Sequence, residues 1–169
     1  DGDIMALPFY SYHCGMFLRQ DIYDDPTEQA NFLEEYGYDL APPTNNEELT
    51  DQAEFFNRDA GEELKGVPLE KELNGMAMQA SAFQANDEFS TYLWGNGGDY
   101  VDVVKDDSGA VTEYVVTQEN TDLMIQTMEE YVGRVQHASP GVLTANFDFV
   151  VAALGQGDTP LVGMMYSNC

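Results

Sequence analysis

Basic residues are scarce in this chain: its 169 residues include 6 lysines and arginines against 31 aspartates and glutamates, for a formal net charge of −25. The acidic residues are spread along the chain as far as Asp158 and form no terminal tail. Nucleic acids and anionic membranes are recognised through a cationic surface, so the composition excludes both as electrostatic partners. Two interpretations of the acidity stay open. We favour adaptation to high salt over a surface that recruits cations, because lysine is scarce everywhere.

Cysteine and histidine are also scarce, and the sequence lacks the motifs of most enzymes. Cys14, Cys169 and two distant histidines form neither a CxxC motif nor a zinc-ligand spacing. Serine nucleophile elbows, HExxH helices and phosphate-binding glycine loops are missing too. An enzyme would therefore rest on carboxylates, and neighbours such as Asp87 and Glu88 arise freely in so acidic a chain. We expect no catalytic residue, no metal site and no cofactor.

Long hydrophobic runs are absent as well. None approaches the ~20 residues of a membrane span, and the opening Asp1-Gly2-Asp3 does not resemble a signal peptide. The chain is nevertheless 43% hydrophobic and 12% aromatic, which favours a folded protein over disorder. Its length predicts one domain over residues 1–169.

Helical and strand patterns alternate along the chain. Capping and breaking residues, with apolar spacing, predict helices over 26–36, from Thr44 or Asn45 to near Gly61, and over 86–94, 121–135 and 147–154. Strands are expected over 4–10, 12–18, 76–80 and 161–166, with a hairpin of 100–104 and 111–116 whose turn contains Asp106 and Asp107. The alternation predicts an α/β fold in which helices cover a mixed, mainly parallel sheet.

Aromatic residues gather near the predicted ends of these elements. Flat rings with a polar edge suit sugars, although packing in the core is the alternative for each of them. The residues are Tyr10, Tyr12, Phe17, Trp94, Tyr100 and Tyr166.

Several strings, in order along nearly the whole chain, resemble one family. They are Phe17–Tyr23, Tyr36–Pro43, Glu47–Leu49, Ala53–Phe56, the W-x-x-G-G-like turn Leu93–Asp99, Pro140–Gly141 and Leu154–Val162. Together they resemble the extracellular, periplasmic-type solute-binding proteins (family 1) of carbohydrate-type ABC importers. The chain departs from the family's pattern at Asn45-Asn46, at Leu154 and at Pro160-Leu161. These departures affect the expected helix packing more than the expected function.

The resemblance implies one lobe of a two-lobe protein, because the family runs to roughly twice this length. The implied architecture is the C-terminal-type lobe of a type II periplasmic-binding fold, three-layer-like, with both chain ends near the hinge. It also implies that Cys14 and Cys169 are neighbours on adjacent strands, where a disulfide needs Cα atoms within ~7 Å. A buried or idle thiol is the alternative.

Five residues match the family's ligand contacts. The resemblance places Tyr12 and His13 on the crossing segment, Asp87 at a helix start, Trp94 at the glycine turn and Tyr166 on the returning segment. Aromatic rings would stack on a sugar while Asp87 and the Tyr12 hydroxyl form hydrogen bonds to its hydroxyl groups.

The implied function is binding of a sugar or oligosaccharide and its delivery to ABC permease subunits, by a monomeric, non-enzymatic protein. The implied location is periplasmic or extracellular, with a lipidated N-terminus of the full-length protein as the anchor. Two alternatives stay open: an acidic cell-surface interaction or cation-binding module, and a carboxylate-based glycoside hydrolase.

Overall fold

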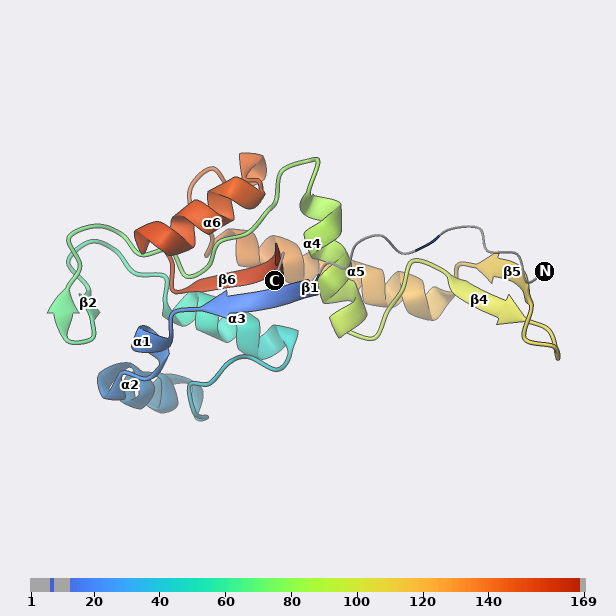
Figure 1. The fold of residues 1–169 in the computed structure, drawn as a ribbon. Coiled ribbons are helices and arrows are strands. Elements are labelled where there is room, and N and C mark those ends of the chain that lie inside the picture. Colours follow the sequence, from blue (N-terminus) through green and yellow to red (C-terminus); the bar gives the residue numbers. More distant parts are fainter. Residues whose placement is uncertain (1–6, 8–12, 168–169) are drawn as a thin grey trace.

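The structure, a computed structural model, describes residue 7 and residues 13–167. Figure 1 shows the arrangement of the elements. In chain order they are β1 (His13–Leu18), α1 (Gln20–Tyr23), α2 (Pro26–Tyr36), α3 (Asn46–Phe55), β2 (Glu63–Leu64), β3 (Val67–Pro68), α4 (Ala85–Gly95), β4 (Asp102–Lys105), β5 (Val111–Val115), α5 (Gln118–Val135), a 3-10 helix (Val142–Thr144), α6 (Phe147–Gln156) and β6 (Leu161–Ser167).

A two-stranded antiparallel ribbon of β1 and β6 lies at the centre, although its strands are far apart in the sequence. Side chains alternate between the two faces of a strand. Phe17 accordingly packs in a cluster with Val150 and Ala153 of α6, whereas Met16 and Leu18 pack against a separate cluster built from α3, α4 and α5. Side chains of β1 thus pack toward α6 on one face and toward the cluster shared by α3, α4 and α5 on the other. In Figure 1 α6 and α3 lie on opposite sides of the ribbon.

The predicted mixed, mainly parallel sheet is wrong, and so is the three-layer-like lobe of a type II periplasmic-binding fold built on it. Within residues 13–167 the strands form three separate two-stranded antiparallel sheets. The segment 76–80, predicted as a strand, is buried but forms no ladder: the Met76 amide donates to His137 O, in an isolated parallel bridge, and the Ala77 amide donates to Leu161 O. A short apolar run shows that a segment is buried, but its periodicity does not show which neighbour it pairs with.

Local capping chemistry sets the helix boundaries. Pro26 occupies the first turn of α2, and Gly37 ends it in the left-handed region at φ 80°, both as predicted. The Asn45 side chain accepts a hydrogen bond from the Glu48 amide and starts α3, as one of the two predicted caps. Helix α3 ends at Phe55, well before Gly61, and α5 starts at Gln118 rather than Thr121.

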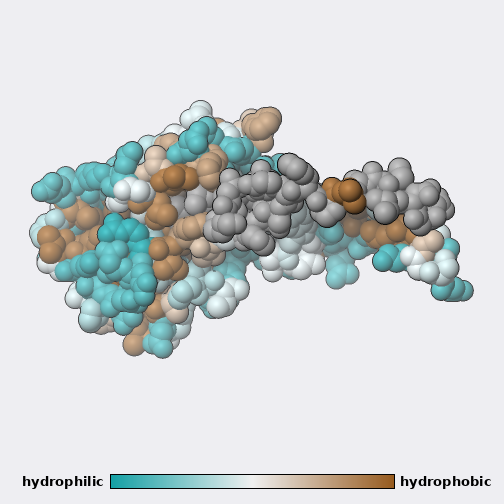
Figure 2. Space-filling view, in the orientation of Figure 1, coloured by the Kyte–Doolittle hydropathy of each residue, from teal (hydrophilic) through white to brown (hydrophobic). Residues whose placement is uncertain are grey.

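The predicted hairpin is confirmed as β4 and β5. Asp106 forms its turn, since its Oδ1 accepts from the Ser108 hydroxyl and from the Ser108 and Ala110 amides at 2.6 to 3.1 Å. These hydrogen bonds, the Ser108 side chain first, hold the pKa of Asp106 below its ordinary value. The hairpin extends away from the ribbon in Figure 1, and hydrophobic residues lie at the surface in that part of Figure 2. Tyr114 of β5 is 67% exposed.

A buried ion pair joins the β2–β3 segment to α2. Glu28 is buried and accepts from Arg58 Nη2 and from the Lys65 amide, both at 2.6 Å. The Arg58 guanidinium also lies over the Phe55 ring at 4.7 Å. One buried carboxylate therefore holds a segment that has little hydrophobic packing of its own.

Replacing Arg58 with methionine is expected to lower the free energy of unfolding by about 2 kcal/mol, because it leaves the buried Glu28 carboxylate with one donor. Urea unfolding measures the loss. Arg19→Met is the matched control: it removes an ion pair with Asp21 whose side chains are 34% and 51% exposed, and should cost less than ~1 kcal/mol. Equal losses in the two variants would contradict the special role of the buried pair.

Candidate functional site

Three side chains share one face of α4. Asp87, Thr91 and Trp94 are spaced four and three residues apart, which places them on one side of a helix, about 10 Å from end to end. Asp87 lies exposed in the first turn, and Trp94 is 55% exposed in the last. We call these three residues the α4 face. It combines a carboxylate, a hydroxyl and a large exposed ring.

A hollow of about 190 Å³ adjoins this face. It lies where β1, the loop before α3 and helix α4 meet, and Thr91 belongs to both the hollow and the α4 face. The complete lining is Met16, Pro43, Thr44, Asn45, Asn46, Thr91, Tyr92 and Gly95. The hollow and the α4 face together are called the α4 cleft below.

A chain of amides fixes the end of α4 that carries Trp94. Asn46 Nδ2 donates to the Tyr92 carbonyl at 3.2 Å and to Asn96 Oδ1 at 2.7 Å. Asn96 Nδ2 in turn donates to Thr127 Oγ1 at 2.9 Å and to a carboxylate oxygen of Glu130 at 3.0 Å. These bonds tie α4 to α3 and α5, so the exposed ring projects from a rigid support.

A buried polar cluster lies on the core-facing side of α4. Glu88 accepts from the Tyr92 hydroxyl at 3.0 Å and the Tyr131 hydroxyl at 3.5 Å, and the Arg134 guanidinium lies 4.4 Å from the centre of the Tyr92 ring. Burial raises the pKa of Glu88 to about 7, against the opposing effect of the Gln79 amide that bonds to it. Its neighbours are all core residues, so the cluster positions α4.

The five predicted ligand contacts have different outcomes. Asp87 and Trp94 lie on the same face of α4, as one site requires. His13 and Tyr166 lie on the two paired strands, where His13 is opposite Ser167 and Tyr166 is opposite Cys14. Tyr12 lies outside the described residues.

The other sequence candidates are less informative for the site. Phe17 and Tyr100 pack against the hydrophobic clusters, which is the alternative the sequence left open for aromatic residues. Cys169 lies outside the described residues, so its predicted proximity to Cys14 stays a prediction. Tyr10 lies outside them too.

Sequence reasoning missed Thr91, Met16 and Asn46. Helical spacing from Asp87 and Trp94 would have identified Thr91, since it lies on the face that they share. Met16 and Asn46 reach the α4 cleft only through the pairing of β1 with β6 and the packing of α3 on α5. No local pattern carries that information.

Residues 7 and 13–167 contain neither a candidate membrane-spanning helix nor a candidate metal site. No helix there is long and apolar enough to cross a membrane. Nor do three or more His, Cys, Asp and Glu side chains in that part of the chain gather in a group able to hold a metal ion.

Comparisons of the chain with protein-family models, with curated proteins and with solved structures found no match.

Proposed function

We propose that the protein binds a sugar or an oligosaccharide at the α4 cleft and delivers it to the permease of an ABC importer. The observation that carries the proposal is the α4 face. A ring that is 55% exposed shares one face of a helix, itself held by hydrogen bonds, with a hydroxyl and a carboxylate. An aromatic face packs on the C–H groups of a sugar, while the polar side chains bind its hydroxyl groups.

The central ribbon supports the two-lobe part of the proposal. Because β1 and β6 are antiparallel and His13 is opposite Ser167, the chain enters and leaves the ribbon at the same end. Two adjacent strands of this kind can serve as a hinge to a second lobe, whose closure would exclude water from the ligand. One lobe supplies only part of the contacts, so we expect these 169 residues alone to bind weakly, with a Kd on the order of millimolar.

Trp94 is the single tryptophan of the chain, so intrinsic fluorescence reports on the proposed site directly. Titration with a panel of mono- and oligosaccharides should give a saturable change in emission for the true ligand class. Trp94→Leu, followed by calorimetry, should weaken binding about 3- to 10-fold, because ring stacking is lost. Asp87→Asn should weaken it by a similar factor, through loss of a charge-assisted hydrogen bond.

Tyr114→Leu is the matched control, since Tyr114 is a 67% exposed aromatic residue of β5 and belongs neither to the α4 face nor to the lining of the hollow. It should leave binding unchanged. Absence of binding by every sugar and polyol would overturn the proposal. A calcium-dependent rise in Tm without sugar binding would favour the cation-binding module, and turnover of chromogenic glycosides would favour the hydrolase.

A further inference from the structure

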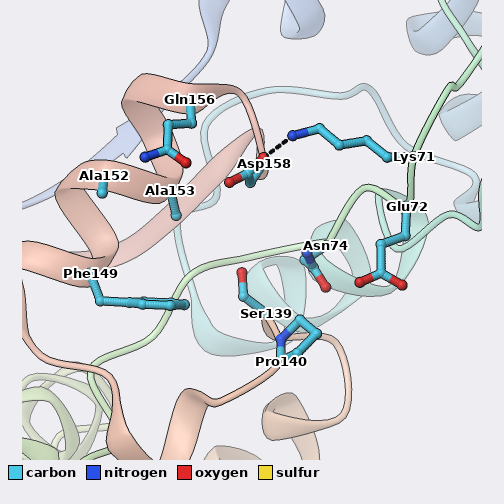
Figure 3. A pocket seen from close by; sticks show the side chains of 10 residues that line it. All are labelled: Lys71, Glu72, Asn74, Ser139, Pro140, Phe149, Ala152, Ala153, Gln156 and Asp158. Atoms are coloured by element: carbon cyan, nitrogen blue, oxygen red, sulfur yellow. Dashed lines mark hydrogen bonds and ion pairs between the residues drawn. The ribbon is translucent and has the colours of Figure 1, made fainter.

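A second hollow of about 400 Å³ lies away from the α4 cleft and shares no residue with it. It opens between the loop at 71–74, the Ser139-Pro140 turn and helix α6, with Asp158 just before β6 (Figure 3). Ser167, at the far end of β6, pairs with β1 where the proposed hinge begins. The two hollows therefore belong to different parts of the fold.

Ser139 is the unusual residue of this hollow. It is only 5% exposed, and its Oγ has no hydrogen-bond partner among the described residues. In Figure 3 the hydroxyl points into the hollow, toward the space between Asn74 and Phe149. Buried hydroxyl groups are almost always paired, and an unpaired one is costly. A molecule in the hollow that donated to or accepted from Oγ would remove that cost.

Together, the other polar groups around the hollow supply both hydrogen-bond donors and acceptors. Lys71 and Asp158 form an ion pair, which largely cancels their charges but leaves further N–H donors and a free carboxylate oxygen. Asn74 and Gln156 each add an amide with a donor and an acceptor. A hydroxyl group of a ligand can donate and accept hydrogen bonds, whereas an ammonium group can only donate and a carboxylate can only accept them. The half-buried Phe149 ring supplies an apolar wall for C–H groups.

We propose that this hollow is a second ligand site, which takes a small neutral polyhydroxy compound such as a polyol or a monosaccharide. The site does not depend on the function proposed for the α4 cleft. An anionic ligand is disfavoured by the net charge of −25 and by the Glu72 carboxylate in the lining. Lys71 already pairs with Asp158, and Glu72 can accept a hydrogen bond from a ligand hydroxyl group, so a neutral ligand with several hydroxyl groups meets both the donors and the acceptors of the hollow.

Glycerol and D-glucose, titrated separately into ¹⁵N-labelled protein and followed by ¹H–¹⁵N NMR, test the proposal. We expect saturable shifts of the Asn74, Ser139 and Gln156 backbone amides for at least one of the two. Ser139→Ala should weaken that binding about 5-fold without lowering Tm, because it removes a hydroxyl that has no hydrogen-bond partner among residues 7 and 13–167. If Ser139 had a merely structural role, Ser139→Ala would lower Tm instead.

Gln156→Ala, an exposed change that carries little risk to folding, should weaken binding about 3-fold. Ser108→Ala in the hairpin turn is the matched control and should have no effect on binding. Shifts that never saturate, shifts with methylammonium chloride but with neither neutral probe, or binding unaffected by Ser139→Ala would each overturn the proposal. Shifts confined to Thr91 and Trp94 would overturn it while supporting the sugar site at the α4 cleft.

Discussion

Replacing Gly75 with alanine should destabilise the protein by more than ~4 kcal/mol, the largest effect we expect from any single methyl group. A Cβ at this buried position would lie 1.7 Å from the Ala53 carbonyl oxygen and 2.6 Å from its carbonyl carbon. Both atoms belong to the backbone of α3, so no side chain can rotate away to make room. Overpacking of a core costs ~1 to 3 kcal/mol where side chains can adjust, and more where they cannot.

The close approach of Gly75 to α3 matters for the whole centre of the fold. The Asn74 amide donates to Asp158 O, and the Met76 amide donates to His137 O, so the segment is held on both sides of the glycine. A shift that accommodated the methyl group would break these bonds and move Met76, which is fully buried. Thermal and urea unfolding measure the effect, and for a chain of this size we expect Tm to fall by roughly 10 °C or more.

Gly133→Ala is the matched control for Gly75→Ala. Gly133 lies inside α5, and a Cβ there would have no neighbour within 4 Å, so the same substitution should stabilise the protein by ~0.5 to 1 kcal/mol. Opposite signs for the two variants would show that close backbone contact, and not glycine content, sets the effect. A Gly75→Ala protein with an unchanged Tm would contradict the packing of 74–76 against α3.

The parts of the fold that could be predicted are those decided by neighbours in the sequence. Asn45 caps α3, Pro26 and Gly37 bound α2, and Asp106 forms its turn with residues two and four positions away. Each involves a side chain and a backbone group within a few residues, so the sequence pattern contains the whole interaction.

The arrangement of the strands could not be predicted, because partners are chosen by contacts between distant segments. The apolar runs at 13–18 and 161–167 are compatible with parallel or antiparallel pairing, and the helix contacts on either side decide between them. The functional groups divide in the same way. Asp87 and Trp94 share a helix and could be placed together, whereas the unpaired Ser139 hydroxyl becomes visible only when three segments meet around it.

Glu88 should make the protein less stable as the pH rises from about 4.5 to about 7. Burial raises the pKa of this carboxyl from 4.5, its ordinary value, to about 7 in the folded protein. Between these values the folded protein holds a proton that the unfolded chain has released, so the stabilisation, complete below pH 4.5, is lost as the pH rises through 7. The difference between the two pKa values corresponds to about 3 kcal/mol of unfolding free energy.

Glu88→Gln isolates this contribution, because the acidic background of the chain is common to both proteins. Relative to Glu88→Gln, the wild-type protein should lose about 3 kcal/mol of unfolding free energy between pH 4.5 and pH 8, measured by urea unfolding at constant salt. Glu129→Gln, on the exposed side of α5, is the matched control and should give a difference that stays flat with pH. A flat difference for Glu88→Gln as well would contradict the buried, protonated state.

The polar and charged neighbours of Glu88 reduce the free-energy cost of ionising it in the core. The Tyr92 and Tyr131 hydroxyls donate to the carboxylate, and Arg134 offsets part of its charge, so ionisation above pH 7 is partly compensated within the cluster. Glu88 is adjacent to Asp87 on α4 and faces the core, whereas Asp87 is exposed. The stability that is lost as the pH rises toward 7 therefore falls on the helix that carries the α4 face, and Trp94 fluorescence should change as Glu88 ionises near pH 7 in the wild-type protein but not in Glu88→Gln.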